Sequence, residues 1–216
     1  MTVVERTTVL PYPPEEVYAW HSRPGALERL TPPWEPVTVT SREGTIESGR
    51  VTLRLSLGPV HAKWVVQHHD GIPGREFRDR QEHGPFESWE HLHRFEPEGA
   101  GGCRMTDRVE FRLPAHNITG ALAAETVSHR IERGLRYRHD TLRADLATHE
   151  NAPAPLRIAI TGATGLVGTS LSAFLTTGGH TVLPVTRRDP GPGQVGWAPR
   201  HGRIEAGKLE GVDAVV

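Results

Sequence analysis

Alternation between hydrophobic and polar positions dominates the first half of the chain and predicts a series of β-strands. Within residues 49–57, Val51, Leu53 and Leu55 alternate with polar neighbours, which is the period of a strand with one buried face. The same pattern predicts strands near 3–10, 36–42, 49–57, 60–69, 75–81, 87–96 and 103–112. Prolines followed by acidic residues predict a short helix starting at Pro13, and a second short helix is predicted over 24–30, closed by Thr31-Pro32-Pro33.

The period changes to that of a helix after the last of these strands. From Ile118 to about Thr148, one stripe of apolar residues recurs at spacings of four and seven, which predicts one long helix. The stripe consists of Val127, Ile131, Leu135, Leu142 and Leu146. A strongly curved antiparallel sheet wrapped around this helix would bury the apolar faces of both. We therefore predict an α+β fold for residues 1–149.

A glycine-rich turn between a strand and a helix marks the start of a second domain. The apolar strand 157–161 runs directly into glycines at 162, 165 and 168, and an amphipathic helix pattern begins at once. A second strand is predicted over Thr181–Thr186. This order of elements is that of an α/β Rossmann fold, and the chain ends too soon to complete one. We therefore expect an incomplete Rossmann segment.

A proline- and alanine-rich stretch separates the two patterns. Residues 150–155 end in Ala-Pro-Ala-Pro, which cannot continue a helix and favours an extended linker. The predicted organisation is therefore a ligand-binding domain over 1–149, a linker over 150–155 and the N-terminal portion of a Rossmann domain over 156–216.

Composition excludes several classes of partner. The chain has 25 Lys and Arg against 26 Asp and Glu, without a basic block, so nucleic acid is not expected as a partner. No apolar run reaches membrane-spanning length, and the first residues lack the pattern of a signal peptide. The single cysteine, Cys103, excludes an internal disulfide. These features predict a cytoplasmic protein.

Strand alternation places a group of aromatic and titratable residues on one face of the predicted sheet. His91 and His93 share a face of their strand with Trp89 and Phe95, and Asp107 shares a face of the next strand with its apolar neighbours. If both faces are concave, they line an apolar or aromatic ligand pocket. Its predicted members are Trp64, Trp89, His91, His93, Phe95 and Asp107.

Three roles are open for His91, His93 and Asp107. They could hydrogen-bond one another and support the sheet, or they could perform general acid–base catalysis or orient a ligand. A His-x-His pair on a strand could also hold a metal ion, but no third ligand has an obvious place in the sequence. No metal is therefore predicted.

The glycine spacing in the second segment suits the phosphates of a dinucleotide. Gly162 allows a tight turn, Gly165 lets the backbone approach the pyrophosphate, and Gly168 permits close packing of helix on strand. Amides at the start of the helix would then face the phosphates. The predicted contacts are Gly162, Thr164, Gly165, Leu166, Val167 and Gly168.

The end of the second strand indicates which dinucleotide is bound. An NAD site usually places an acidic residue there, whereas this chain has Thr186, Arg187 and Arg188. Two guanidinium groups suit the 2′-phosphate of NADP(H), so we favour NADP(H) over NAD(H). Asp189 follows closely and could still bind the ribose.

The first segment resembles a known superfamily. The order of elements, together with Pro11-Tyr12-Pro13-Pro14-Glu15-Glu16-Val17-Tyr18 and the stretches 84–95 and 107–114, is similar to the helix-grip (SRPBCC) superfamily. That superfamily includes START-type lipid carriers, plant pathogenesis-related ligand binders and bacterial polyketide cyclases. The resemblance implies a small-molecule ligand, apolar or aromatic, and leaves open whether the domain is a carrier or an enzyme.

The second segment resembles the start of an atypical short-chain dehydrogenase/reductase family, often labelled sugar-nucleotide epimerase-like. The stretches 160–168, 185–188 and 196–216 carry the resemblance, and the last of these is similar to the run up to the third strand. The family's catalytic Tyr-x-x-x-Lys is absent, because Tyr12, Tyr18 and Tyr137 all lack a lysine four residues on. The resemblance implies an NADP(H)-dependent oxidoreductase or epimerase-like protein, of which this chain would be an inactive piece. The alternatives are a hydrophobic-ligand carrier or sensor, or polyketide cyclase-like chemistry in the first domain.

Overall fold

The computed structural model describes residues 1–57, 59–114, 120–152 and 154–216. Contacts between residues divide the chain into two compact units, one formed by 1–22 and 30–143 and the other by 23–29 and 144–216. The first unit contains β1 (Thr2–Leu10), α1 (Pro14–Ser22), β2 (Val37–Glu43), β3 (Arg50–Leu57), β4 (Val60–Ile72), β5 (Glu76–His83), β6 (Ser88–Glu98) and β7 (Gly102–Arg112). Two further helices, α2 (Ala26–Leu30) and α3 (Gly120–His149), contribute residues to both units.

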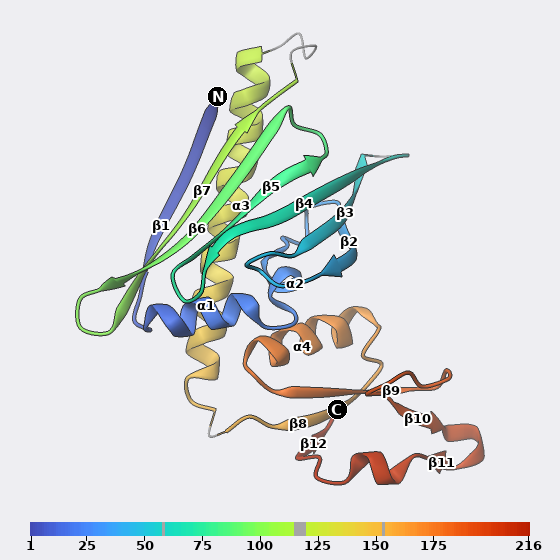
Figure 1. The fold of residues 1–216 in the computed structure, drawn as a ribbon. Coiled ribbons are helices and arrows are strands. Elements are labelled where there is room, and N and C mark those ends of the chain that lie inside the picture. The colour runs from blue at the N-terminus through green and yellow to red at the C-terminus, as the bar shows by residue number, and fades with distance from the viewer. Residues whose placement is uncertain (58, 115–119, 153) are drawn as a thin grey trace. The chain divides into compact units, whose positions relative to one another are not determined.

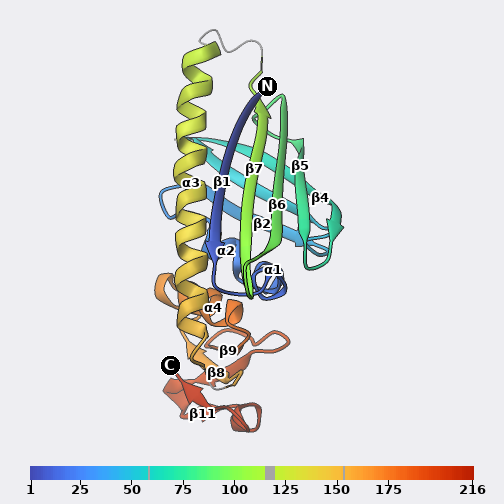
Figure 2. The ribbon, with the colours of Figure 1, turned by 90° about the vertical axis from the view of Figure 1, so that its left-hand side faces the viewer.

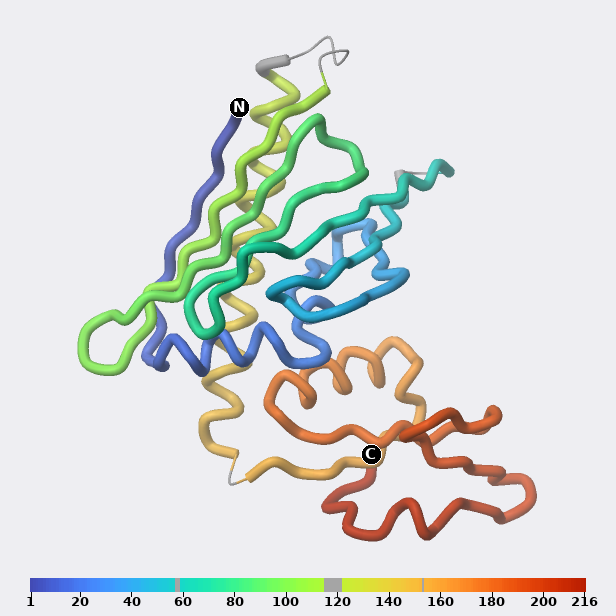
Figure 3. Tube along the Cα trace, in the orientation of Figure 1, coloured from blue at the N-terminus to red at the C-terminus, as the bar shows by residue number. Residues whose placement is uncertain are grey.

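The seven strands of the first unit form one antiparallel sheet in the order β1-β7-β6-β5-β4-β3-β2 (Figures 1 and 3). The first strand of the chain therefore pairs with the last strand of this unit. Register shifts interrupt the pairing of β2 with β3, near Val39, and of β4 with β5, near Val65 and after His69. Such bulges bend and twist a strand, which allows the sheet to curve.

The helix α3 covers one face of this sheet (Figure 2). Val4 on β1, Val109 and Phe111 on β7, and Leu135 on α3 form a buried cluster, and each is at most 5% exposed. Val127 and Ile131 pack against the cluster from the same helix. The predicted helical stripe is confirmed, and the fold is the predicted helix grip.

The strand positions agree with the alternation pattern to within two residues, except at the end of β4. β4 continues to Ile72 rather than ending at 69, because Ile72 still pairs with Glu76 across the turn to β5. The extension passes through Asp70, which has a positive φ of 49°. The predicted start of the long helix at Ile118 lies outside the described residues.

The second unit contains a small, mostly parallel sheet. Its elements are β8 (Arg157–Thr161), α4 (Leu166–Thr177), β9 (Thr181–Thr186), β10 (Val195–Ala198), β11 (Arg203–Ile204) and β12 (Ala214–Val215), with short 3₁₀ turns over Pro199–His201 and Ala206–Leu209. The strand order is β11-β10-β9-β8-β12, and all neighbours except β11 and β10 are parallel. Ala159, Val185 and Val195 form its buried core.

The second unit contains the predicted elements and additional strands. The predicted strands 157–161 and 181–186 and the helix between them are present. The strand that follows them is β10, and β12 at the end of the chain lies on the other side of β8. The segment 23–29 joins this unit through the ion pair of Arg29 with Asp145, at 2.5 Å.

The boundary at 150–155 and the Rossmann assignment remain predictions. Among the described residues, none of the helices is both long and apolar enough to cross a membrane.

Truncating the helical stripe should destabilise the first unit. Leu135 is 3% exposed and contacts the cluster on β1 and β7, so Leu135→Ala removes buried contacts and leaves a cavity. We expect a loss of about 2–5 kcal/mol in the free energy of unfolding, measured by urea denaturation followed by tryptophan fluorescence.

Leu122→Ala on the same helix is the matched control, because Leu122 is 71% exposed. Its effect should stay within about 0.5 kcal/mol. Equal losses in the two variants would contradict the described packing of α3 on the sheet.

Candidate functional site

Strand register brings two aspartates and two histidines together on the face of the sheet that α3 covers. Asp79 on β5 lies directly opposite His91 on β6, and His93 on β6 lies opposite Asp107 on β7. Directly opposed residues point to the same face of a sheet, and so do residues two apart on one strand. The four side chains therefore form one cluster across three adjacent strands.

Asp107 lies at the centre of this cluster and is 1% exposed. Its Oδ1 lies 2.6 Å from Nδ1 of His93, in an ion-pair contact that is not aligned as a hydrogen bond. Its Oδ2 lies 3.1 Å from Nε2 of His139 on α3, and Nδ1 of His139 lies 2.7 Å from the hydroxyl of Thr8 on β1. Because a carboxylate only accepts, Nε2 of His139 donates to Asp107, and Nδ1 of the neutral ring would accept from Thr8.

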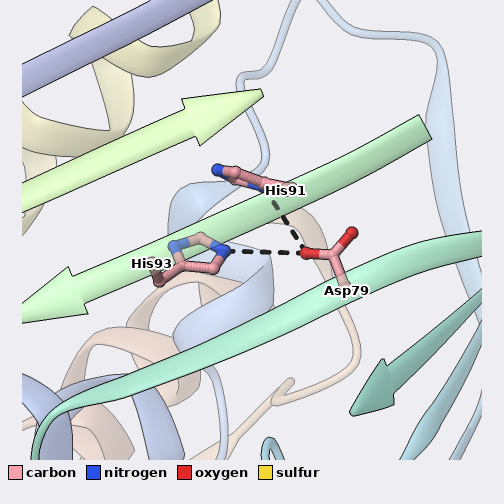
Figure 4. Close-up of side chains that lie close together, drawn as sticks. All are labelled: Asp79, His91 and His93. Atoms are coloured by element: carbon pink, nitrogen blue, oxygen red, sulfur yellow. Dashed lines mark ion pairs between the residues drawn. The ribbon is translucent and has the colours of Figure 1, made fainter. Parts of the chain in front are cut away.

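Asp79 faces both imidazoles from the neighbouring strand (Figure 4). Its Oδ2 lies 3.5 Å from Nδ1 of His91 and 3.6 Å from Nε2 of His93. Its Oδ1 accepts a hydrogen bond of 3.2 Å from the indole N–H of Trp89. Each histidine ring therefore lies between two carboxylates, Asp79 on one side and Asp107 on the other.

Burial and mutual contact set the charges of the cluster. Burial alone would raise the pKa of Asp107, but His93 and the hydrogen bond from His139 hold that pKa well below its usual range. The pKa of Asp79 is likewise lowered, because its contacts with His91 and His93 outweigh burial. Burial lowers the pKa of His91, and the charge of His93 adds to this effect. For His93, the attraction of Asp107 outweighs burial and raises the pKa.

Aromatic side chains surround the charged cluster. Phe77 stacks on His93 with ring centroids 4.1 Å apart, and Phe95 is 1% exposed. Burial lowers the pKa of the nearby His21 to about 4. Trp64 lies edge to face with Trp89 at 5.2 Å. The polar groups therefore contact one another within an otherwise apolar environment, which strengthens their electrostatic interactions.

The structure brings the predicted residues together and adds others. Trp89, His91, His93, Phe95 and Asp107 lie on one face of the sheet, as alternation predicted, and Trp64 contacts Trp89. That these residues line a ligand pocket stays a prediction.

Asp79 and His139 are not among the site residues predicted from the sequence. His139 falls within the apolar stripe, four residues after Leu135, so the helical period itself would have placed it on the buried face. Predicting that Asp79 contacts the histidines requires the pairing of β5 with β6, which the alternation pattern alone does not give.

The glycine turn of the second unit has the conformation that its spacing predicts. Gly162 has a φ of +64°, which side-chain-bearing residues rarely adopt. A Cβ on Gly168 would lie 2.1 Å from the carbonyl oxygen of Gly162, so helix and turn approach too closely for any other residue. Gly165 precedes α4, and the first helical residues, Leu166 and Val167, are 93% and 76% exposed.

The basic end of the next strand lies at the same edge of the small sheet. β8 and β9 are parallel, so the turn after Thr161 and the residues after Thr186 follow the carboxyl ends of neighbouring strands. Arg187 and Arg188 are exposed, and the Thr186 hydroxyl accepts a 3.1 Å hydrogen bond from the backbone N–H of Arg188. Thr164 in the glycine turn is also exposed.

Comparison with known proteins places the first unit in a family. A family model described as polyketide cyclase / dehydrase and lipid transport matches residues 10–137, which is more than half of the chain. The chain belongs to this polyketide cyclase family. The aromatase/cyclase ZhuI from Streptomyces sp. R1128 shares the fold, with 19% identity, a TM-score of 0.53, and coverage of 70% of this chain and 96% of that one.

Other relatives of this polyketide cyclase family member are named as epimerases. The crystal structure of a nucleoside-diphosphate sugar epimerase from Corynebacterium glutamicum is 33% identical, with a TM-score of 0.77, over 98% of this chain and 44% of that one. A curated epimerase family protein from Mycobacterium bovis is 42% identical over 60 residues, which is 27% of this chain and 20% of that protein. The chain therefore spans less than half the length of both relatives.

Removing the Thr8 hydroxyl should weaken the buried cluster. Thr8→Val keeps the shape of the side chain but leaves Nδ1 of the buried His139 without its hydrogen-bond partner. We expect a loss of about 1–3 kcal/mol in the free energy of unfolding, measured by urea denaturation.

Thr7→Val provides the control on the adjacent position of the same strand. Thr7 is exposed and shares its hydrogen bond with Thr106, so its loss should cost less than about 0.5 kcal/mol. A Thr8→Val variant as stable as Thr7→Val would show that the hydrogen bond from Thr8 does not stabilise the cluster.

Proposed function

We propose that this chain binds NADP(H) through its second unit and an apolar or aromatic small molecule through its first. It would do so as part of an oxidoreductase or epimerase-like protein of the short-chain dehydrogenase/reductase type. The observation that carries the proposal is the glycine turn after β8, with its left-handed Gly162 and the close contact between Gly168 and Gly162.

The strand order supports a dinucleotide site at this turn. From β8 the chain passes through α4 to β9 on one side, whereas β12 pairs with β8 on the other side. Parallel sheets bind ligands beyond the carboxyl ends of their strands at such a point of divergence. The backbone amides at the start of α4 would bind the pyrophosphate there, because the helix dipole favours anions.

The exposed arginines after β9 support NADP(H) as the dinucleotide. Arg187 and Arg188 follow the strand that neighbours the glycine turn, where the adenosine ribose of a bound dinucleotide would lie. A guanidinium group can form two charge-assisted hydrogen bonds with a 2′-phosphate. The nicotinamide would supply hydride chemistry, and the residues of this chain would bind and orient the cofactor.

The names of the relatives support the epimerase-like part of this proposal. The epimerase from Corynebacterium glutamicum matches 98% of this chain at 33% identity. Since this chain covers only 44% of that protein, the activity of a whole protein of this type is part of the proposal.

The aromatic residues near β4 and β6 support the proposed ligand of the first unit. Trp64, Phe86 and Trp89 lie in mutual contact, with ring centroids between 4.9 and 5.9 Å apart. The indole nitrogen of Trp64 is buried and has no hydrogen-bond partner among the described residues. This N–H could donate to a polar group of an aromatic ligand that stacks on the cluster.

A carrier or a cyclase is the second candidate function. Family membership of the first unit favours it, because the family's description includes both lipid transport and cyclase activity. The short contact of His93 with Asp107 would suit general acid–base catalysis on a bound ligand. In this alternative, the second unit would not bind a dinucleotide.

Replacing an arginine after β9 tests the cofactor assignment. Arg187→Ala in the intact protein should weaken NADPH binding by at least about tenfold, because a charge-assisted hydrogen bond to the 2′-phosphate is lost. NADH binding should change little. Isothermal titration with each dinucleotide measures both affinities.

Arg200→Ala is the matched control, because Arg200 is an exposed arginine elsewhere in the second unit. It should leave both affinities unchanged. Equal weakening of NADPH and NADH by Arg187→Ala would contradict the 2′-phosphate assignment, and binding of neither by the unaltered protein would favour the carrier.

Replacing Trp64 tests the ligand site of the first unit. The flat aromatic probe 2-naphthol should bind the unaltered chain, and Trp64→Ala should weaken this binding by about tenfold, since both stacking and the indole N–H are lost. Calorimetry and probe fluorescence measure the affinity.

Trp34→Ala is the control, because Trp34 is 41% exposed and contacts Tyr137 and Arg133 on α3 instead. It should not change the affinity for 2-naphthol. Equal weakening by the two substitutions would place the probe outside the Trp64 cluster.

A further inference from the structure

We propose that Asp79, His91 and His93 bind a divalent transition-metal ion of the Zn²⁺ class. Oδ2 of Asp79, Nδ1 of His91 and Nε2 of His93 converge in Figure 4, and the three ligand atoms lie within 4.8 Å of one another. The proposed function assigns no metal to either unit.

The distances between these atoms suit a shared ion better than direct hydrogen bonds. The separations of 3.5 and 3.6 Å between Asp79 and the two rings exceed the usual N–H···O range of 2.7–3.2 Å. Ligand atoms that bind one zinc ion tetrahedrally at about 2.1 Å lie roughly 3.4 Å apart. The carboxylate oxygen therefore has nearly the spacing from both nitrogens that a common ion requires.

The opposite side of each ring determines which nitrogens are free to bind a metal. Oδ1 of Asp107 lies 2.6 Å from Nδ1 of His93 and 3.8 Å from Nε2 of His91. A carboxylate only accepts, so the proton of a neutral His93 is favoured on Nδ1, which faces Asp107 at the shorter distance. Nε2 of His93 then points a lone pair at Oδ2 of Asp79, which is also an acceptor. A cation between these two acceptors would relieve their repulsion, and Nδ1 of His91, at 3.5 Å from the same oxygen, could be its third ligand.

The surrounding contacts have the form of an outer shell around a metal site. Histidine ligands commonly donate their second N–H to a carboxylate, which fixes the ring, and Asp107 lies beside the second nitrogen of His93 in this way. Asp107 is in turn held by His139. Trp89 holds Oδ1 of Asp79 by a hydrogen bond and leaves Oδ2 directed at the imidazoles.

The ligand set indicates the class of ion. Two imidazoles and one carboxylate suit Zn²⁺ or Fe²⁺, whereas Mg²⁺ and Ca²⁺ prefer oxygen ligands alone. With three protein side chains bound to the ion, a fourth coordination position would remain for water or for a small molecule bound in the first unit. The ion would also offset the negative charge of the two buried carboxylates.

The competing arrangement has a proton in place of the metal, with a charged His93 bridging Asp79 and Asp107. Metal titration of the 216-residue chain, after dialysis against a chelator, separates the two. Calorimetry with Zn²⁺ gives stoichiometry and affinity, and Co²⁺ reports its coordination through visible d–d absorption. We expect one ion per chain, a tetrahedral Co²⁺ spectrum and an increase in Tm with Zn²⁺.

Two variants and a control locate the ion. Asp79→Asn should lower the affinity for Zn²⁺ by about tenfold to a hundredfold, because a ligand is lost. Asp107→Asn should lower the affinity by about the same factor, because the carboxylate that orients His93 is lost. His83→Gln, which replaces an exposed histidine on the same strand as Asp79, should leave affinity unchanged.

Two outcomes would overturn the proposal, and the first does not depend on whether any variant folds. One is a folded, unaltered chain that binds no stoichiometric Zn²⁺ or Co²⁺. The other is a folded Asp79→Asn variant that keeps the affinity and the Co²⁺ spectrum of the unaltered chain.

Discussion

The buried charge of Asp107 is the constraint on which the interior of the first unit depends. A carboxylate that is 1% exposed would be too costly to ionise without partners, so its position requires His93 on β6 and His139 on α3. Thr8 on β1 then supports His139. One aspartate thus links the strand at the edge, the central strands and the long helix, and it favours the register in which all of these contacts form.

This network specifies the structure more than it stabilises it. Buried ion pairs recover little beyond the cost of removing two charges from water, whereas losing one partner is expensive because the other is left unpaired. The stability of the unit comes mainly from the apolar cluster of Val4, Val109, Phe111 and Leu135. The charged cluster beside it occupies positions that apolar side chains could fill, which is a reason to attribute a function to it.

Periodicity predicted the elements, and pairing between elements determined the rest. Alternation gave the seven strands and the faces of His91, His93 and Asp107, because side-chain direction along a strand is a local property. The contact of Asp79 with the two histidines depends on how β5 pairs with β6. Register shifts in the adjacent pairing of β4 with β5 make this arrangement hard to predict from alternation. The same holds in the second unit, where the glycine turn was readable but the place of β12 beside β8 was not.

The position of Asp79 bears on the roles that the sequence left open for the histidines. A purely structural role rests on hydrogen bonds, but the contacts of Asp107 with His93 and, at 3.8 Å, with His91 are not aligned hydrogen bonds. Acid–base catalysis needs one ring that exchanges a proton with a ligand, and a second carboxylate at 3.5 Å would bias that exchange. The cation that we propose between the rings and Asp79 would be bound by Oδ2 of Asp79 and one nitrogen of each ring at the distances observed.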